Sequence, residues 1–466
     1  MNRFASIVAG LSLAFVGTSI TIAATINVNP GESIQAAIYA ASDGDTIQLV
    51  QGLYTESNIN VNSTVTIQGT VVDGDPVTIV QRLTDGQPVF VISNGNATLR
   101  GLQILPVSGT YGTGISITSG SPTIVNCYIS GHTGSGISCT NDNATISTPW
   151  ITDCTIHDNS GNNGGGIGCF EGSSPNINNC TISDNTAGSN GGGIYCGHTS
   201  PTIIACTITG NTAPNGGGIA CDTGNPDIRI CTISNNTGGG ISYNNSNGGI
   251  IDCTISGNTA GDGSGGGLYL VGSDAIACNP NITNCTISDN TAGSDGGGIE
   301  CWYNSSPTLT DCHITDNRVT GSFAFGGGGF SASGGDGADP HLINCTITGN
   351  TNWVGLPANI AGVANGTDYG GRGEQIDLGR IIFEDSTVCG TGEHNIWGVL
   401  IEHRGENHIS DCIDDGDVNG DGDVDTNDLA QLRSSLGVCP HDTDMDGDTD
   451  IEDLLNVVAG WGTTCP

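Results

Sequence analysis

Two short runs near the end of the chain combine carboxylates and a glycine at the spacing of a calcium-binding loop. They read DVNGDGDVDTND over residues 417–428 and DTDMDGDTDIED over residues 442–453. Such a loop takes oxygen ligands from positions 1, 3, 5, 7 and 12, and a glycine at position 6 provides its sharp turn. The sequence therefore predicts two calcium ions. The predicted ligands are Asp417, Asn419, Asp421, the carbonyl of Asp423 and Asp428 for the first ion, and Asp442, Asp444, Asp446, the carbonyl of Asp448 and Asp453 for the second.

The residues after each loop are typical of a short helix. LAQLRSSLG follows the first loop and LLNVVAGWG follows the second, so residues 413–466 form a duplicated loop–helix module. Because the carboxylates of one loop repel one another, we expect the module to be compact only with calcium bound. The duplication resembles a type I dockerin, which implies a cohesin-like module or another cell-surface partner. A calcium-stabilised module without such a partner is the alternative.

The net charge limits which partners the chain can bind, and its first residues indicate where the protein is located. Arginine and lysine together number 9 against 47 acidic residues, and the net charge is −38. Such a surface repels phosphate backbones, which excludes nucleic acid as a partner. Arg3, an apolar run over residues 7–16 and the small residues Ala23 and Ala24 predict a signal peptide over residues 1–24. No other segment is long and apolar enough to span a membrane, so we expect a secreted or cell-surface protein.

One pattern recurs along the middle of the chain. The stretch NCTISDNTAGSNGGGIYC at residues 179–196 returns almost unchanged at residues 284–301. A Cys–x–Ile triplet returns about every 26 residues, a period that suits one coil of a parallel β-helix and is too short for most two-helix repeats. The cysteines that open these triplets are Cys127, Cys154, Cys180, Cys206, Cys231, Cys253, Cys285, Cys312 and Cys345.

Each repeat divides into three short strands. Ile194 and Cys196 are two residues apart, and so are Cys206 and Ile208, so each pair lies on one face of a strand. The step of three from Ile203 to Cys206 breaks this alternation and predicts a corner between two strands. Successive coils of a β-helix stack about 4.8 Å apart, so we expect Cys and Ile to form inward-facing columns. The glycine triplet is expected where a Cβ atom would clash.

Asparagine occupies two further positions of the repeat. At or next to the predicted corner it tolerates left-handed backbone angles. After the Cys–x–Ile strand it can form a ladder of side-chain hydrogen bonds from coil to coil. The corner residues are Asn126, Asn179, Asn284 and Asn344, and the ladder residues are Asn159, Asn185, Asn211, Asn236, Asn258, Asn290, Asn317 and Asn350.

The 19 cysteines allow two structural interpretations. They can be small apolar core residues, or some can form disulfides between adjacent coils, because the stacking distance lies within disulfide range. An odd number leaves at least one thiol without an intrachain partner. We favour core packing with some disulfides, and we do not expect zinc, because the chain has no C-x-x-C pair.

The start of the expected mature chain carries a family resemblance. Residues Ser33 to Ala41 predict a helix with Ile34, Ala37, Ile38 and Ala41 on one face, followed by the strands DTIQLV and GLYTE. This arrangement resembles the N-terminal cap of pectin-lyase-like right-handed β-helices. The predicted fold is therefore an all-β right-handed parallel β-helix over residues 25–412, with three short strands per coil and an N-terminal capping helix. A small α-helical dockerin-like calcium-binding domain follows it.

The resemblance also implies an enzyme of acidic polysaccharides, and the residues give that activity little support. The family's lyases commonly use a Lys or Arg base, but this chain has no lysine, and its solenoid arginines are scattered and share no motif. A two-carboxylate hydrolase needs a pair of acids at a defined distance. The repeat places its aspartates in turns, where solvated side chains are the simpler interpretation. These aspartates are Asp153, Asp252 and Asp311 before the cysteine, and Asp158, Asp184, Asp289 and Asp316 before the ladder asparagine.

A regular outward-facing array is the last feature of the repeat. The C-T-I-S/T strands direct pairs of hydroxyls outward, as at Thr181/Ser183 and Thr207/Thr209. The array resembles that of β-helical ice-binding proteins, but binding of a sugar polymer is the better hypothesis. A solvated face of strand-forming threonines is the simplest alternative. We therefore predict a non-catalytic display, adhesion or carbohydrate-binding protein, with a polysaccharide lyase or glycoside hydrolase as the alternative.

Overall fold

The computed structural model describes residues 23–93, 95–107, 111–141, 147–321, 327–333, 339–352, 360–363, 380–384, 386–389, 396–397, 400–404 and 408–410. The chain divides into two units between Ile409 and Ser410, and the account below concerns the first. Most of the expected signal peptide and the whole of the predicted calcium module lie outside the described residues. The domain limits and the calcium ligands therefore stay predictions.

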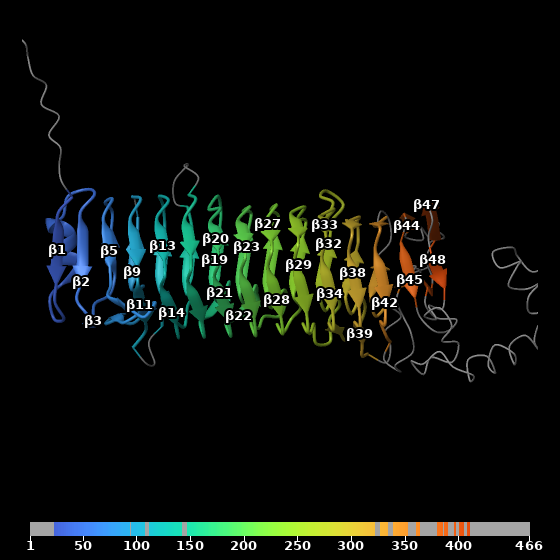
Figure 1. Ribbon diagram of the computed structural model, residues 1–466, viewed down its shortest axis with the longest axis horizontal. Helices are drawn as coiled ribbons and strands as arrows, with labels where there is room; N and C mark the ends of the chain where they lie inside the picture. The colour runs from blue at the N-terminus through green and yellow to red at the C-terminus, as the bar shows by residue number, and fades with distance from the viewer. Residues whose placement is uncertain are drawn as a thin grey trace, which may run out of the picture. The chain divides into compact units, whose positions relative to one another are not determined.

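The described strands form three long parallel sheets, and each coil of the chain contributes one strand to each sheet (Figure 1). Sheet A has 15 strands in the described ranges: β1 (Thr25–Val28), β2 (Thr46–Leu49), β5 (Thr66–Gln68), β10 (Thr98–Arg100), β13 (Thr123–Val125), β16 (Trp150–Thr152), β20 (Asn176–Asn178), β24 (Thr202–Ile204), β27 (Asp227–Arg229), β30 (Gly249–Ile251), β33 (Asn281–Thr283), β37 (Thr308–Thr310), β41 (His341–Ile343), β44 (Arg380–Glu384) and β47 (Leu400–Arg404).

Sheets B and C repeat this order along the axis. Sheet B contains β3 (Gly52–Thr55), β8 (Thr78–Gln81), β11 (Leu102–Leu105), β14 (Tyr128–Ser130), β17 (Thr155–His157), β21 (Thr181–Ser183), β25 (Thr207–Thr209), β28 (Thr232–Ser234), β31 (Thr254–Ser256), β34 (Thr286–Ser288), β38 (His313–Thr315), β42 (Thr346–Thr348), β45 (Thr387–Cys389) and β48 (His408–Ser410). Sheet C contains β4 (Ile59–Val61), β9 (Phe90–Ile92), β12 (Ile115–Ile117), β15 (Ile137–Cys139), β19 (Ile167–Phe170), β23 (Ile194–Gly197), β26 (Ile219–Asp222), β29 (Ile241–Asn244), β32 (Leu268–Val271), β36 (Ile299–Trp302), β40 (Phe330–Ser333), β43 (Ile360–Val363) and β46 (Ile396–Trp397).

Three small pairs of strands lie outside these sheets. Two are parallel and lie in the glycine-rich turns between sheets B and C, and the third is an antiparallel hairpin between sheets A and B. The pairs are β18 (Ser160–Asn163) with β22 (Thr186–Asn190), β35 (Thr291–Ala292) with β39 (Arg318–Val319), and β6 (Val71–Val72) with β7 (Asp75–Pro76).

The register of the strands places like residues over one another. In sheet B, Ile182 pairs with Ile208, and Ile208 pairs with Ile233. All three side chains are fully buried, as the repeat predicted. The corner between sheets A and B is also where the sequence placed it, because Asn179 and Ala205 adopt positive φ angles of 51° and 53°. The prediction of a parallel β-solenoid with three strands per coil is confirmed.

The glycine triplet has the steric role expected of it. A Cβ atom on Gly193 would lie 2.7 Å from the carbonyl oxygen of Gly218 in the next coil and 3.1 Å from Nδ2 of Asn211. Because real Cβ atoms keep a larger distance from backbone oxygens, only glycine allows the coils to approach here.

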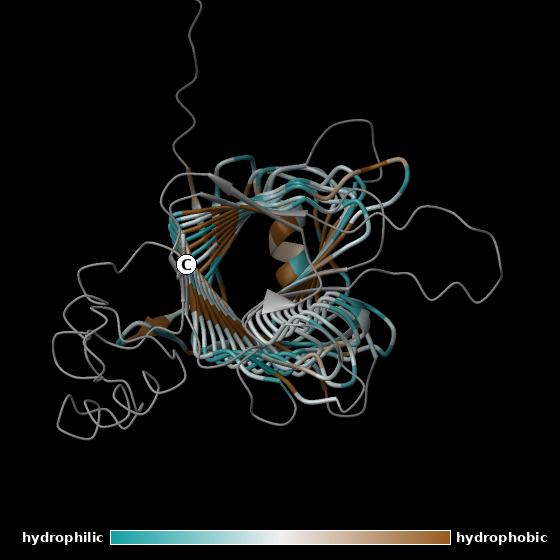
Figure 2. Ribbon diagram, turned by 90° about the vertical axis from the view of Figure 1, so that its right-hand side faces the viewer, coloured by the Kyte–Doolittle hydropathy of each residue, from teal (hydrophilic) through white to brown (hydrophobic). Residues whose placement is uncertain are grey.

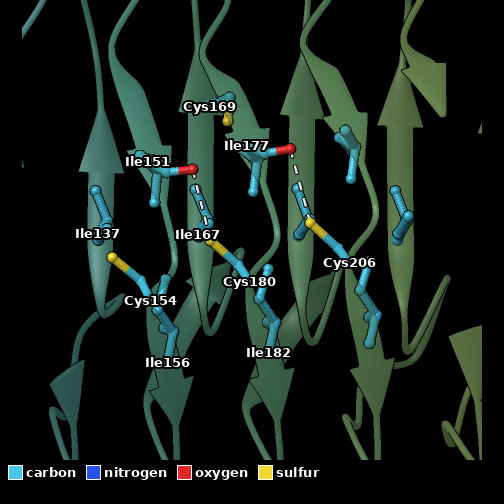
Figure 3. Close-up of a cluster of buried hydrophobic side chains, with 14 of the residues drawn as sticks. Ile137, Ile151, Cys154, Ile156, Ile167, Cys169, Ile177, Cys180, Ile182 and Cys206 are labelled. Atoms are coloured by element: carbon cyan, nitrogen blue, oxygen red, sulfur yellow. Dashed lines mark hydrogen bonds between the residues drawn. The ribbon is translucent and has the colours of Figure 1, made fainter. Parts of the chain in front are cut away.

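The described cysteines are core residues with free thiols. The fifteen cysteines from Cys127 to Cys345 are buried and unbridged, so the disulfide interpretation finds no support among them. In the triplet column each thiol donates to a carbonyl of the preceding coil: Sγ of Cys180 lies 3.5 Å from the oxygen of Ile151, and Sγ of Cys206 lies 3.7 Å from that of Ile177 (Figure 3). The next coil after Cys345 has Ser386 in this position, and its hydroxyl donates to the carbonyl of Leu342 at 3.1 Å. The column therefore selects a small side chain that can also donate a hydrogen bond.

The predicted asparagine ladder is present and buried. Nδ2 of Asn185 donates to Oδ1 of Asn211 at 3.0 Å, and Nδ2 of Asn211 donates to Oδ1 of Asn236 at 3.1 Å. The same pattern runs from Asn159 to Asn350. His132 occupies the position before Asn159, and its backbone N–H donates to Oδ1 of Asn159 at 3.1 Å. Since each amide bonds to both neighbouring coils, the ladder fixes the turn that leaves sheet B.

A helix lies near the first coil, over the residues where the sequence predicts one. α1 (Ile34–Ala40) begins after Ser33, whose hydroxyl accepts from the backbone N–H of Ala36 at 3.1 Å. Glu56 also accepts from the N–H of Ile34 at 2.8 Å. Ile34 and Ile38 are buried in the same core as the sheets, and the helix lies inside the outline of the solenoid in an end view (Figure 2). Its role as a cap stays a prediction.

No helix in the described ranges is long and apolar enough to cross a membrane.

Candidate functional site

The outward face of sheet B carries two columns of hydroxyl groups in register. Each strand alternates a threonine, a buried isoleucine, and a serine or threonine, so one side chain points inward and two point outward. The outer column is Thr181, Thr207, Thr232, Thr254 and Thr286, and the inner column is Ser183, Thr209, Ser234, Ser256 and Ser288. The columns continue in Thr346 and Thr348, after His313 and Thr315.

These hydroxyls are available to a ligand. The threonines of the outer column are exposed, and the inner column is half-buried. No side-chain hydrogen bond joins an outer-column hydroxyl to another residue that the structure describes, whereas Ser234 donates to Thr209 at 3.3 Å in the inner column. The face therefore offers repeated donors and acceptors about 4.8 Å apart along the axis. Tyr128 and His157 end the array on the N-terminal side, where their rings meet edge to face at 4.5 Å.

Carboxylates and amides are neighbours at both ends of the edge of sheet B that adjoins sheet A, and Ala205 and Ile230 lie between the two groups. Nδ2 of Asn179 donates to Oδ1 of Asp153 at 2.7 Å, and Nδ2 of Asn284 donates to Oδ1 of Asp252 at 2.6 Å. Asn344 likewise donates to Asp311 at 2.5 Å. Asn284 lies between Asp252 and Asp311 and keeps these two like charges two coils apart, which limits the repulsion between them.

The opposite edge of sheet B carries the other aspartates of the repeat. Asp184 and Asp289 have positive φ angles of 55° and 56°, and both side chains are exposed. The carboxylate of Asp184 covers Gly210 in the next coil, where a Cβ atom would lie 2.5 Å from Oδ1. All seven candidate acids are thus exposed turn residues on two edges of one face, as the simpler interpretation predicted. The structure places none of them in a buried acid pair of the kind that a hydrolase uses.

One buried acid was missed by the sequence analysis. Glu300 lies on β36, next to Tyr269 of β32 in the register of sheet C, and is 1% exposed. Burial, and then the charge of Glu300, raise the pKa of Tyr269 to about 12. Glu300 occupies an outward position of its strand, and Gly296 in the turn before β36 lies close to it, since a Cβ atom there would lie 2.7 Å from the backbone nitrogen of Glu300. The strand pattern marks Glu300 only as an outward residue, so the sequence did not predict that it is buried.

No group of three His, Cys, Asp or Glu side chains within the described ranges is arranged to hold a metal ion. The predicted calcium ligands, from Asp417 to Asp453, lie outside those ranges, so the calcium prediction concerns the C-terminal module alone.

The family comparison defines the class of the protein. A family model described as "Right handed beta helix region" matches residues 87–225 and 185–417, which together are more than half of the chain. The chain therefore belongs to the right-handed β-helix family. No curated protein matches it.

Several solved structures share the fold at low identity. The A-module of the mannuronan C-5 epimerase AlgE4 from Azotobacter vinelandii is 15% identical, with 83% of this chain and 99% of that chain covered and a TM-score of 0.44. The catalytic domain of a GH87 α-1,3-glucanase, in complex with nigerose, is 14% identical over 83% of this chain and 68% of that chain, with a TM-score of 0.39. The periplasmic alginate epimerase AlgG is 13% identical over 82% and 83%, also with a TM-score of 0.39.

Proposed function

We propose that this chain is an exported, non-catalytic carbohydrate-binding rod whose sheet B face binds a polysaccharide. The observation that carries the proposal is the unbroken pair of hydroxyl columns from Thr181 to Ser288. A polymer of sugar units also presents hydroxyls at regular intervals, so it can exchange many weak hydrogen bonds with such a face. Because the bonds repeat from coil to coil, modest single contacts add to useful affinity.

The edges of the face favour a neutral polymer. Exposed aspartates line both edges, and the chain as a whole has a net charge of −38. A polyanion would meet this field along its whole length, while a neutral glucan or mannan would not. The exposed turn positions of the aspartates also favour a binding role over hydrolysis.

The proposal includes export and attachment through the C-terminal module. The apolar N-terminal run supports export, and the two aspartate-rich loops support a calcium-dependent, dockerin-like anchor to a cohesin-like or other surface partner.

Binding to insoluble polysaccharides tests the proposal. In the triple variant Thr181→Val, Thr207→Val and Thr232→Val, the strands keep β-branched residues but lose three hydroxyls. We expect the variant to bind a neutral polysaccharide at least about tenfold more weakly, because each lost hydrogen bond is worth about 0.5–1.5 kcal/mol. The matched control makes the same change to valine at Thr66, Thr98 and Thr123, which form a threonine column on sheet A.

The control should bind as tightly as the unmodified chain. Equal loss in the two triple variants, or no loss in the sheet B variant, contradicts the proposal. Release of new reducing ends or unsaturated ends from the polymer would show that the protein is an enzyme instead.

A further inference from the structure

A polar pocket lies on the outward side of sheet A, close to its N-terminal end. Its volume is about 370 Å³. The floor is formed by three neighbouring positions of the sheet: Gln48 pairs with Gln68, and Gln68 pairs with Arg100. These residues share one column, so their side chains leave the sheet on the same side.

An inserted hairpin forms the wall of this pocket. Most coils turn from sheet A to sheet B through a short corner, but here β6 and β7 lie between the two strands. The hairpin leans along the axis, because the carbonyl of Gly74 accepts from Nδ2 of Asn126, which lies two coils further on, at 3.3 Å. Val71 covers Gly101, where a Cβ atom would lie 2.6 Å from Cγ2 of Val71 and where φ is +63°. The glycine thus allows the hairpin to close the pocket.

The exposed side chain of Arg100 lines this pocket. The guanidinium of Arg100 makes no ion pair or hydrogen bond with any residue that the structure describes, although the chain carries 47 acidic residues. By contrast, Arg229 on the same face is paired with Asp227 at 2.6 Å. The amide nitrogen of Gln48 is held by the carbonyls of Leu49 and Gln68 at 3.1 and 3.2 Å, so its oxygen remains an acceptor.

We propose that this pocket binds a single carboxylate-bearing sugar unit. The guanidinium of Arg100 would hold the carboxylate through two parallel hydrogen bonds, a geometry for which arginine is suited. The amides of Gln48, Gln68 and Asn126 would bind the ring hydroxyls. The volume is at the small end of the range for ligand pockets, which fits one or two sugar rings.

The surroundings limit the site to one acidic unit. The column neighbours of Arg100 are Gln68 and Val125, which carry no charge. Of the residues that line the pocket only Arg100 is cationic, so a second carboxylate would have no cation to pair with there. A longer polyuronate should therefore bind no more tightly than the single unit. The inference is independent of the proposed function, since it uses none of the sheet B threonines.

Titration calorimetry with the full chain tests the proposal at fixed ionic strength. The probes are a hexuronic acid, the matching neutral hexose, acetate and inorganic phosphate. The hexuronic acid should bind at least tenfold more tightly than each of the others. Arg100→Gln should weaken its binding roughly tenfold to a hundredfold, the worth of a charge-assisted pair, and Gln68→Leu should weaken it less. Arg318→Gln is the matched control, since Arg318 is an exposed arginine on β39.

Three results would overturn the inference. Phosphate or acetate that binds as tightly as the hexuronic acid would show a plain anion site. Equal loss in the Arg100 and Arg318 variants would show a general effect of charge, and absence of hexuronic acid binding would remove the site. The variants also distinguish this site from the hydroxyl face. The Arg100 variant should still bind the polymer, and the sheet B triple variant should still bind the hexuronic acid.

Discussion

The asparagine ladder allows a sharp test of how the coils are held in register. Asn211 is fully buried, and its side chain makes four hydrogen bonds. Its Oδ1 accepts from the backbone N–H and from Nδ2 of Asn185, both at 3.0 Å. Its Nδ2 donates to the carbonyl of Ile182 at 2.9 Å and to Oδ1 of Asn236 at 3.1 Å. Asn211→Ala removes all four bonds.

The cost can be worked out from these contacts. The buried N–H of Asn185 loses its acceptor, which costs about 1–3 kcal/mol, and each of the other three bonds contributes about 0.5–1.5 kcal/mol. The expected loss of stability is therefore about 2.5–7.5 kcal/mol. Because a coil of a solenoid contacts only its neighbours, we expect this loss to be concentrated in the coils next to Asn211.

Native-state hydrogen exchange measures the effect coil by coil. The amide of Asn185 and the amides of strands β21, β25 and β28 should exchange at least about a hundredfold faster in the variant. Thr207→Ala is the matched control, because Thr207 lies in the same coil, is exposed and makes no side-chain hydrogen bond to a described residue. If the two variants exchange alike, the ladder does not hold the coils and the reasoning is refuted.

Three other predictions follow from buried or charged groups. Burial, opposed by a hydrogen bond to the carbonyl of Ile104 and reinforced by Arg82, lowers the pKa of His132 to about 4, whereas the unfolded chain has a histidine pKa near 6.5. The unfolded state therefore binds more protons between these pH values, so this group should make the free energy of unfolding about 3 kcal/mol higher at pH 7 than at pH 4. His132→Asn should abolish this difference. The buried thiols should not react with a thiol reagent until the chain unfolds, since burial raises the pKa of Cys278, for example, to about 11. If fewer than fifteen thiols react in denaturant without reductant, some of these cysteines form disulfides. Calorimetry should find two calcium ions per chain, and one ion after Asp417→Ala or Asp442→Ala; an unchanged stoichiometry would contradict the loop assignment.

The repeat was readable because stacking constrains the same positions in every coil. Ile182, Cys206 and Asn185 each contact their counterparts in the coils above and below, so a change at one coil disturbs two others. The three strands, the corner at Asn179 and the ladder could all be predicted from residue spacing alone. The hydrogen bond from each thiol to a preceding carbonyl could not, because spacing shows which side chains point inward but not which backbone oxygens they reach.

Sites that occur in only one coil are harder to predict from the sequence, because no other coil repeats their residues. Arg100 belongs to a column in which the neighbouring coils have Gln68 and Val125, so the pattern marks it only as an outward position. It becomes part of a pocket because one corner contains the β6–β7 hairpin and because Gly101 lets Val71 approach. Glu300 also occupies an outward position in the strand pattern, and yet it is buried. In this fold regular positions maintain the solenoid, and the inserted hairpin at one corner creates a pocket that the repeat itself does not have. A change of ligand specificity should therefore arise from changes in the corner hairpin and the turns, and leave the isoleucine, cysteine and asparagine columns unaltered.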